Sequence, residues 1–91
     1  MFTSWGVETT RKYAKADIEK ALAALDDAKY GTILRAKGIV EGDGEWIYFD
    51  YVPGESNIRV GSAAIIGRVC VIGSEIDKKA IAELFSVEYS E

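Results

Sequence analysis

The sequence has no histidine and only one cysteine, Cys70, among its 91 residues. Histidine is the most common ligand for transition metals and the most common general base near neutral pH. A transition-metal site or an acid–base catalytic site in this chain would therefore lack its usual residue. Cys70 lies between two valines with no further cysteine near it, which favours a small buried hydrophobic residue. A single cysteine forms no intramolecular disulfide, which is consistent with a reducing cytoplasm.

Motifs that would identify a chemistry are also missing. The phosphate-binding pattern G-x-x-x-x-G-K-[ST] does not occur, and its nearest match, residues 61–67 followed by Arg68, has the wrong spacing. The acidic residues Glu41, Asp43 and Glu45 do not complete a calcium-binding loop. No paired carboxylates are indicated in a pocket. We therefore expect a non-catalytic chain without a metal or cofactor site of its own.

Charge and hydropathy exclude two further classes of partner. Fifteen acidic residues outweigh eleven scattered basic ones, for a net charge of −4. Because nucleic-acid binders gain much of their affinity from a basic stripe, we expect no nucleic-acid partner. No apolar run approaches the roughly 18 residues that span a bilayer, and Met1 leads into a strand-like segment rather than a signal peptide. These features predict a cytoplasmic protein with no membrane partner.

What is present is the composition of one ordinary globular domain, predicted to cover residues 1–91. Apolar residues make up 48% and charged residues 29%. Residues 2–10 are rich in β-branched and aromatic residues and predict a strand. The segment 14–28 predicts a helix, with Ala14 as a weak N-cap and Gly31 as a left-handed stop. Its apolar stripe has helical spacing and consists of Ile18, Ala21, Leu22 and Leu25.

The segment from Thr32 to Tyr51 predicts a β-hairpin. Asp43-Gly44 is a strong signal for a two-residue type I′ turn, which needs positive φ at both positions. A register shifted by one residue would bury Asp50 without a partner, at a cost of several kcal/mol. Counting outward from the turn gives one apolar inner face, made of Leu34, Ala36, Gly38, Val40, Ile47, Phe49 and Tyr51.

The alternate hairpin positions give an outer face that is polar and aromatic, with Arg35, Lys37, Trp46, Tyr48 and Asp50. The structural interpretation, which the sequence favours, is a Lys37–Asp50 surface ion pair worth ~0–1 kcal/mol, with the aromatic residues under a helix. The functional alternative is a docking surface, because aromatic residues and arginine are enriched at interface hot spots. These five residues are therefore the candidate interaction surface.

The second half predicts further strands and a second helix. Pro53-Gly54 is a type II turn signal, residues 56–60 predict a short strand, and residues 61–67 predict a loop. Residues 68–73 form the most apolar strand, expected near the sheet centre. Asp77 is the expected N-cap of a helix whose buried stripe consists of Ile81, Leu84 and Phe85. A short final strand at residues 87–89 is an option.

Because both helices need a sheet face to cover, the elements predict an α+β fold. It is a two-layer sandwich in which two helices cover one mostly antiparallel sheet of four to five strands, in the order β-α-β-β-β-β-α. If the first strand–helix–strand unit is parallel, its crossover is expected to be right-handed.

Two segments resemble a known family. Ile33-Leu-Arg-Ala-Lys-Gly38, followed by Trp46-Ile-Tyr-Phe49, resembles the core of the CobW C-terminal domain. Arg68-Val-Cys-Val-Ile-Gly73, followed by Glu75-Ile76-Asp77 at the start of a helix, resembles that domain's ending. The resemblance extends over residues 2 to about 85. It implies an accessory, protein-interaction domain of a P-loop GTPase that acts in metal homeostasis or cobalamin biosynthesis, in the manner of a metallochaperone.

The resemblance also implies where cofactors and partners belong. GTP, Mg²⁺ and a transition metal would be bound by the family's N-terminal GTPase domain, which this chain does not match. The implied partners are a CobW-type GTPase domain and a metalloprotein client, with Arg35 and Lys37 as family-typical positions. The chain departs from its relatives in having no histidine and a short 61–67 loop, which argues against a direct metal role. A standalone ferredoxin-like regulatory or small-ligand-binding domain is the alternative.

Overall fold

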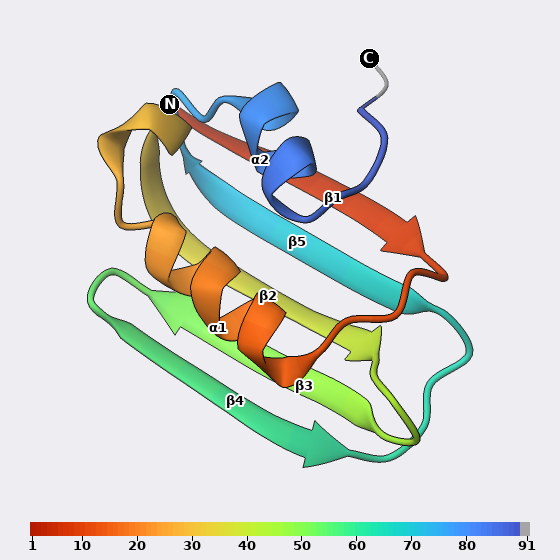
Figure 1. Cartoon of the computed structure of the whole chain (residues 1–91). Helices are drawn as coiled ribbons and strands as arrows, with labels where there is room; N and C mark the ends of the chain where they lie inside the picture. The colour runs from red at the N-terminus through yellow and green to blue at the C-terminus, as the bar shows by residue number, and fades with distance from the viewer. Residues whose placement is uncertain (90–91) are drawn as a thin grey trace.

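The structure is a computed structural model that describes residues 1–89, and it consists of a five-stranded sheet with two α-helices on one face (Figure 1). The strands are β1 (Phe2–Thr9), β2 (Thr32–Glu41), β3 (Trp46–Val52), β4 (Glu55–Gly61) and β5 (Gly67–Ser74). The helices are α1 (Lys15–Ala24) and α2 (Lys78–Leu84), with a short 3₁₀ helix, η1 (Ala28–Tyr30), after α1. The predicted α+β sandwich and its element order are confirmed, with η1 as an addition.

The strand order is β1-β5-β2-β3-β4, and every neighbouring pair is antiparallel. Because β5 pairs antiparallel with both β1 and β2, those two strands run parallel to each other, with β5 inserted between them. The β1–α1–β2 unit is therefore a split β-α-β unit. As predicted, the apolar β5 occupies an interior position, which buries its inward-facing residues Val69 and Val71 completely.

The β2–β3 hairpin has the predicted register, with Val40 opposite Ile47, Gly38 opposite Phe49 and Lys37 opposite Asp50. The turn is of a different type, because among its two central residues only Gly44 has a positive φ, of 73°. The type I′ prediction is therefore wrong. The register survives because any turn with two central residues gives the same pairing of the flanking strands.

Leu34 does not lie on the inner face, so that part of the prediction is also wrong. The pairing of β2 with β5 shifts between Ile33 and Arg35, which marks a β-bulge. As a result Ile33 is buried, with 4% of its surface exposed, while Leu34 is 40% exposed. The extra residue in a bulge breaks the strict alternation of faces on which the prediction depended.

The core lies between the helices and the face of the sheet that they cover, which we call the inner face. Phe85, just after α2, lies between Trp5 and Phe49, with 6.2 Å between ring centroids in each pair. These rings anchor the short second helix, because burying an aromatic side chain removes a large apolar area from water. The helices contribute further buried residues, namely Ile18, Ala21, Leu22, Ile81 and Ala82.

The predicted helix starts are confirmed. Ala14 is the N-cap of α1, and its backbone N–H donates to the Asp17 carboxylate at 3.1 Å. The Asp77 side chain caps α2 by accepting from the backbone N–H of Ala80 at 3.0 Å.

The predicted end of the first helix and the predicted C-terminal strand both differ from the structure. Gly31, with φ of 99°, ends η1 rather than α1, which stops earlier, at Ala24. The segment 87–89 forms no strand, so that option is wrong. The turn after β3 is as predicted, because Gly54 supplies the positive φ, of 77°, that a type II turn requires.

Candidate functional site

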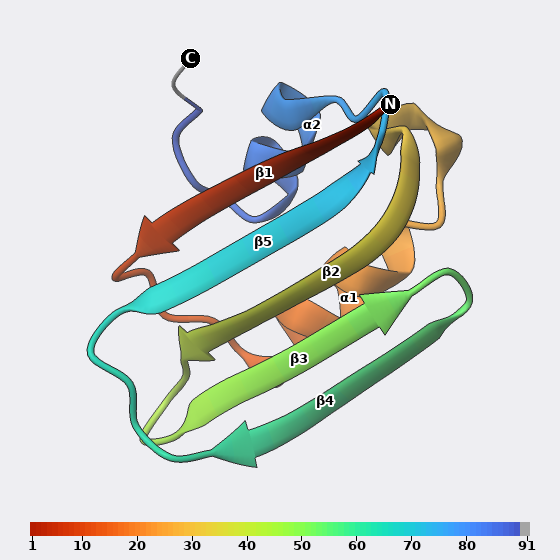
Figure 2. The same ribbon diagram turned by 180° about the vertical axis from the view of Figure 1, so that it is seen from behind.

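Within residues 1–89, both helices lie on the inner face, so the opposite face, which we call the outer face, is uncovered (Figure 2). The five residues of the candidate interaction surface lie on this side. Arg35 and Lys37 on β2 are exposed, while Trp46, Tyr48 and Asp50 on β3 are half-buried. The aromatic residues are therefore not under a helix, contrary to the structural interpretation of the sequence.

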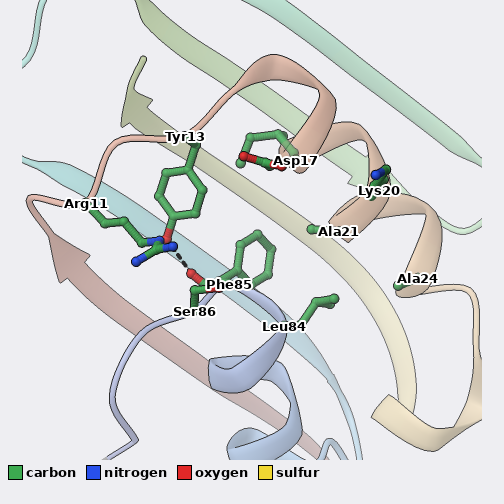
Figure 3. A pocket seen from close by; sticks show the side chains of 10 residues that line it. Arg11, Tyr13, Asp17, Lys20, Ala21, Ala24, Leu84, Phe85 and Ser86 are labelled. Atoms are coloured by element: carbon green, nitrogen blue, oxygen red, sulfur yellow. Dashed lines mark hydrogen bonds between the residues drawn. The ribbon is translucent and has the colours of Figure 1, made fainter. Parts of the chain in front are cut away.

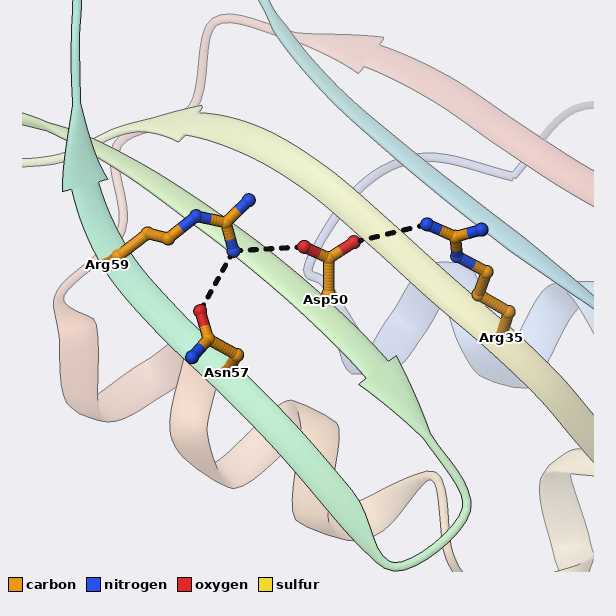
Figure 4. Close-up of polar contacts among 4 residues, drawn as sticks. All are labelled: Arg35, Asp50, Asn57 and Arg59. Atoms are coloured by element: carbon orange, nitrogen blue, oxygen red, sulfur yellow. Dashed lines mark hydrogen bonds and ion pairs between the residues drawn. The ribbon is translucent and has the colours of Figure 1, made fainter.

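Asp50 is the centre of the charged interactions on this face (Figure 4). Its carboxylate contacts Arg59 of β4 at 2.9 Å and Arg35 of β2 at 3.6 Å. Arg59 also donates to the Asn57 side-chain oxygen at 3.0 Å. Since the carboxylate is 38% exposed, each ion pair contributes only ~0–1 kcal/mol.

Lys37 is opposite Asp50 in the sheet, yet it does not form the predicted ion pair. Among residues 1–89, the ion pairs of Asp50 are those with Arg35 and Arg59. The longer guanidinium side chains reach the carboxylate from diagonal positions and can hold it with several N–H donors. The ammonium group of Lys37 is left for solvent or for a partner.

The Tyr48 side chain lies beside these charges and is held in place by its neighbours. Its ring lies over Gly61, where an added Cβ atom would come within 2.6 Å of the ring. Its hydroxyl group donates to the Ser62 carbonyl at 2.8 Å, and the Arg59 guanidinium lies 5.9 Å from the ring centroid. A side chain whose ring and hydroxyl group are both already in contact loses little conformational entropy when another molecule binds against it.

These side chains enclose a shallow hollow of about 480 Å³ on the outer face. Four of the five candidate residues line it, and Trp46 does not. Six further residues line it, and among them Arg59, Arg68 and Cys70 lie outside the hairpin from which the candidate surface was predicted. Because side chains alternate between the two faces of a strand, Arg68 and Cys70 lie on the face opposite the buried Val69 and Val71. That pattern alone does not show which strand lies next to β5.

A second hollow, of about 400 Å³, lies on the helical side between α1 and the end of α2 (Figure 3). There the Tyr13 hydroxyl group donates to the Phe85 carbonyl and joins the two helical segments. Burial raises the pKa of Tyr13, and the positive charge of Arg11 partly offsets that rise. The hydrogen bond holds the start of α1 and the end of α2 together.

The described residues, 1–89, contain no group of three or more histidine, cysteine, aspartate or glutamate side chains placed to hold a metal ion. In the same range no helix has both the length and the hydropathy to cross a membrane.

The molecule is thus an α+β sandwich built on a split β-α-β unit, with helices on one face and an arginine-rich hollow on the other. The family model for the cobalamin synthesis protein cobW C-terminal domain matches residues 2–87. The chain belongs to this family, and the resemblance seen in its sequence is confirmed. No curated protein matches the sequence.

Two solved structures have the same fold. One is the Zn(II)-bound YjiA GTPase from E. coli, with a TM-score of 0.76, 19% identity and 93% of the present chain covered. The other is a Zn(II)-bound triple mutant of YjiA GTPase, with a TM-score of 0.78, 18% identity and the same coverage. The present chain spans 29% of the length of each of those chains.

Proposed function

We propose that this chain is a non-catalytic accessory module of a CobW-type GTPase and that its outer face binds the GTPase domain. The observation that carries the proposal is the outer face itself, which no helix covers within residues 1–89 and which combines arginine and aromatic side chains. Family membership and the likeness to chains described as GTPases support the choice of partner.

An open sheet face is common in antiparallel sheets, so exposure alone does not indicate binding. The composition of this face is more informative. Trp46 and Tyr48 are half-buried on it, and Ile72 of β5 is 38% exposed. Arg35 and Lys37 line one hollow together with Tyr48 and another together with Ile72. Aromatic residues and arginine are the types enriched at interface centres, where they contribute most of the binding free energy.

The wider role follows from the family and belongs to the same proposal. In it, the GTPase domain binds GTP, Mg²⁺ and a transition metal, and the present module positions that domain against a metalloprotein client. Metal homeostasis or cobalamin biosynthesis is the process in which such a protein would act. The single, unpaired cysteine is consistent with a cytoplasmic location.

The test is isothermal titration of the chain with a purified CobW-type GTPase domain, loaded in turn with GDP and with a non-hydrolysable GTP analogue. We expect binding in at least one nucleotide state. Trp46→Ala should weaken it about tenfold or more, as expected for a hot-spot residue. The matched control is Ile65→Ala, in the loop before β5, where the side chain is fully exposed. The proposal is wrong if the domain binds in neither state, or if both variants bind like the wild type.

A further inference from the structure

The outer face carries a trough that crosses the strands. Gly6, Cys70, Lys37, Asp50 and Asn57 are successive partners across all five strands, so they form one transverse row. Two members of this row, Gly6 and Cys70, are small. The rows on either side carry longer side chains, namely Arg68, Ile39, Tyr48 and Arg59 on one side and Ile72 and Arg35 on the other.

Three hollows meet at Cys70 and together form this trough. The hollow of about 480 Å³ reaches from Cys70 toward β4, and a second of about 350 Å³ lies beside Gly6 and Glu8 over β1 and β5. A third of about 130 Å³ lies between Lys37 and Ile72. Cys70 lines all three hollows and Lys37 lines two of them, so we treat the three as one depression that extends from β1 to β4.

The trough has an excess of positive charge. Its cations are Arg35, Lys37, Arg59 and Arg68, and its carboxylates are Glu8 and Asp50. That is an excess of two positive charges in a chain whose net charge is −4. Both carboxylates are already paired, since Glu8 contacts Arg68 at 2.6 Å and Asp50 contacts two arginines. Within residues 1–89 Lys37 has no ion pair, so its charge is available to a ligand.

The spacing of the cations indicates an extended ligand. Arg59 on β4 and Arg68 on β5 are separated by three strand spacings, which amounts to about 14 Å. A single phosphate group is too small to contact cations spread over that distance. An extended polypeptide advances about 3.3 Å per residue, so about four residues would cover it.

We propose that the trough binds an acidic, extended segment of the GTPase domain, an inference that rests on the proposed function. Carboxylates of that segment pair with Lys37 and with the free donors of Arg59 and Arg68, the two arginines at the ends of the span of about 14 Å. Between them an apolar side chain of the segment packs on Cys70. The interface is therefore not confined to the β2–β3 hairpin but continues over β5 to Gly6 of β1.

The experiment compares Lys37→Glu and Lys37→Gln with the wild type in titrations against the purified GTPase domain. Lys37→Glu should weaken binding about ten- to a hundred-fold, and Lys37→Gln should weaken it less. The matched control is Lys79→Glu, an equal charge change at an exposed position on α2, which should bind like the wild type. Wild-type affinity should fall steadily between about 0.05 and 0.5 M NaCl because salt screens the ion pairs. Since Lys37 is exposed, thermal unfolding should show that all three variants remain folded.

The two proposals fail differently. If the GTPase domain binds with the same affinity to wild type and Lys37→Glu, the trough is not the acidic contact, while the proposed function stands. If the domain does not bind at all, the proposed function fails, and a glutamate-rich peptide tests the trough by itself against its glutamine counterpart. Preference for the glutamate peptide that is lost in Lys37→Glu supports the trough. Equal binding of the two peptides, or displacement of the glutamate peptide by millimolar inorganic phosphate, overturns it.

Discussion

Tyr51 donates its phenolic hydrogen to the carboxylate of Asp26 and so ties β3 to the segment that follows α1. The same carboxylate oxygen accepts from the backbone N–H of Gly54 at 3.3 Å, in the turn between β3 and β4. One acidic side chain therefore holds the helical layer to the end of the hairpin that carries the candidate surface. Burial, then the hydrogen bond and the negative charge of Asp26, raise the pKa of Tyr51 well above its usual value.

This relationship predicts how the stability of the fold depends on pH. The pKa of Tyr51 is higher in the folded state than in the unfolded state, so the folded state favours the protonated phenol. The contribution is complete below the unfolded pKa of about 10 and is lost as the pH rises above it. Urea unfolding between neutral and strongly alkaline pH should therefore show falling stability above pH ~10.

Tyr51→Phe provides the control for that effect. It should cost about 1 kcal/mol at neutral pH, since it removes one hydrogen bond, and it should make the alkaline loss less steep. A smaller loss should persist, because burial also raises the pKa of Tyr13. An alkaline slope equal to that of the wild type would show that Tyr51 is not the responsible group.

The close approach of two strands at Gly38 gives a second prediction. An added Cβ atom there would come within 2.6 Å of the Arg68 carbonyl oxygen and still closer to the Phe49 ring. Because a backbone carbonyl in an interior strand pair cannot move aside, Gly38→Ala should cost about 1–3 kcal/mol in the free energy of unfolding.

Gly6→Ala is the matched control, because it also adds a methyl group to a strand of the same sheet. The nearest atom to the added Cβ at Gly6 is the Val69 carbonyl oxygen, at 3.6 Å, an ordinary contact. This variant should be as stable as the wild type or slightly more stable, since alanine suits a strand better than glycine. Chemical denaturation of both variants would refute the steric argument if their losses were equal.

The hairpin shows how much of this molecule the sequence can predict. Its register follows from two local facts, the two-residue turn at Asp43-Gly44 and the need to keep Asp50 out of the core. The position of Leu34 follows from neither, because the bulge in β2 arises in its pairing with β5, which lies more than thirty residues further along the chain. The alternation of residues along a strand therefore predicts on which face of the sheet each side chain lies only where the strand has no bulge.

The candidate site shows the same division between local and long-range information. Lys37 and Asp50 are correctly placed opposite each other, but the arginines that bind Asp50 depend on side-chain reach and on β4 as a neighbour. Arg68 and Cys70 join the site only because β5 lies beside β2. The order of strands in a sheet is a long-range property, and no short segment encodes it.

Asp50 provides a final prediction, which separates stability from binding. Asp50→Asn removes the acceptor charge shared by Arg35 and Arg59, both of which are exposed, so unfolding free energy should fall by ~1 kcal/mol or less. The same change raises the excess positive charge of the trough from two to three. Binding of an acidic segment should therefore become tighter and more salt-dependent, in contrast to the loss expected for Lys37→Glu.

The matched variant is Glu55→Gln, an equal charge change at the exposed start of β4, outside the trough lining. It should leave both affinity and its salt dependence close to those of the wild type. Titration at two salt concentrations distinguishes the possibilities. If Asp50→Asn weakened binding as much as Lys37→Glu, then Asp50 would be a contact for the partner rather than a competitor for the arginines. The partner segment would in that case have to supply donors as well as carboxylates.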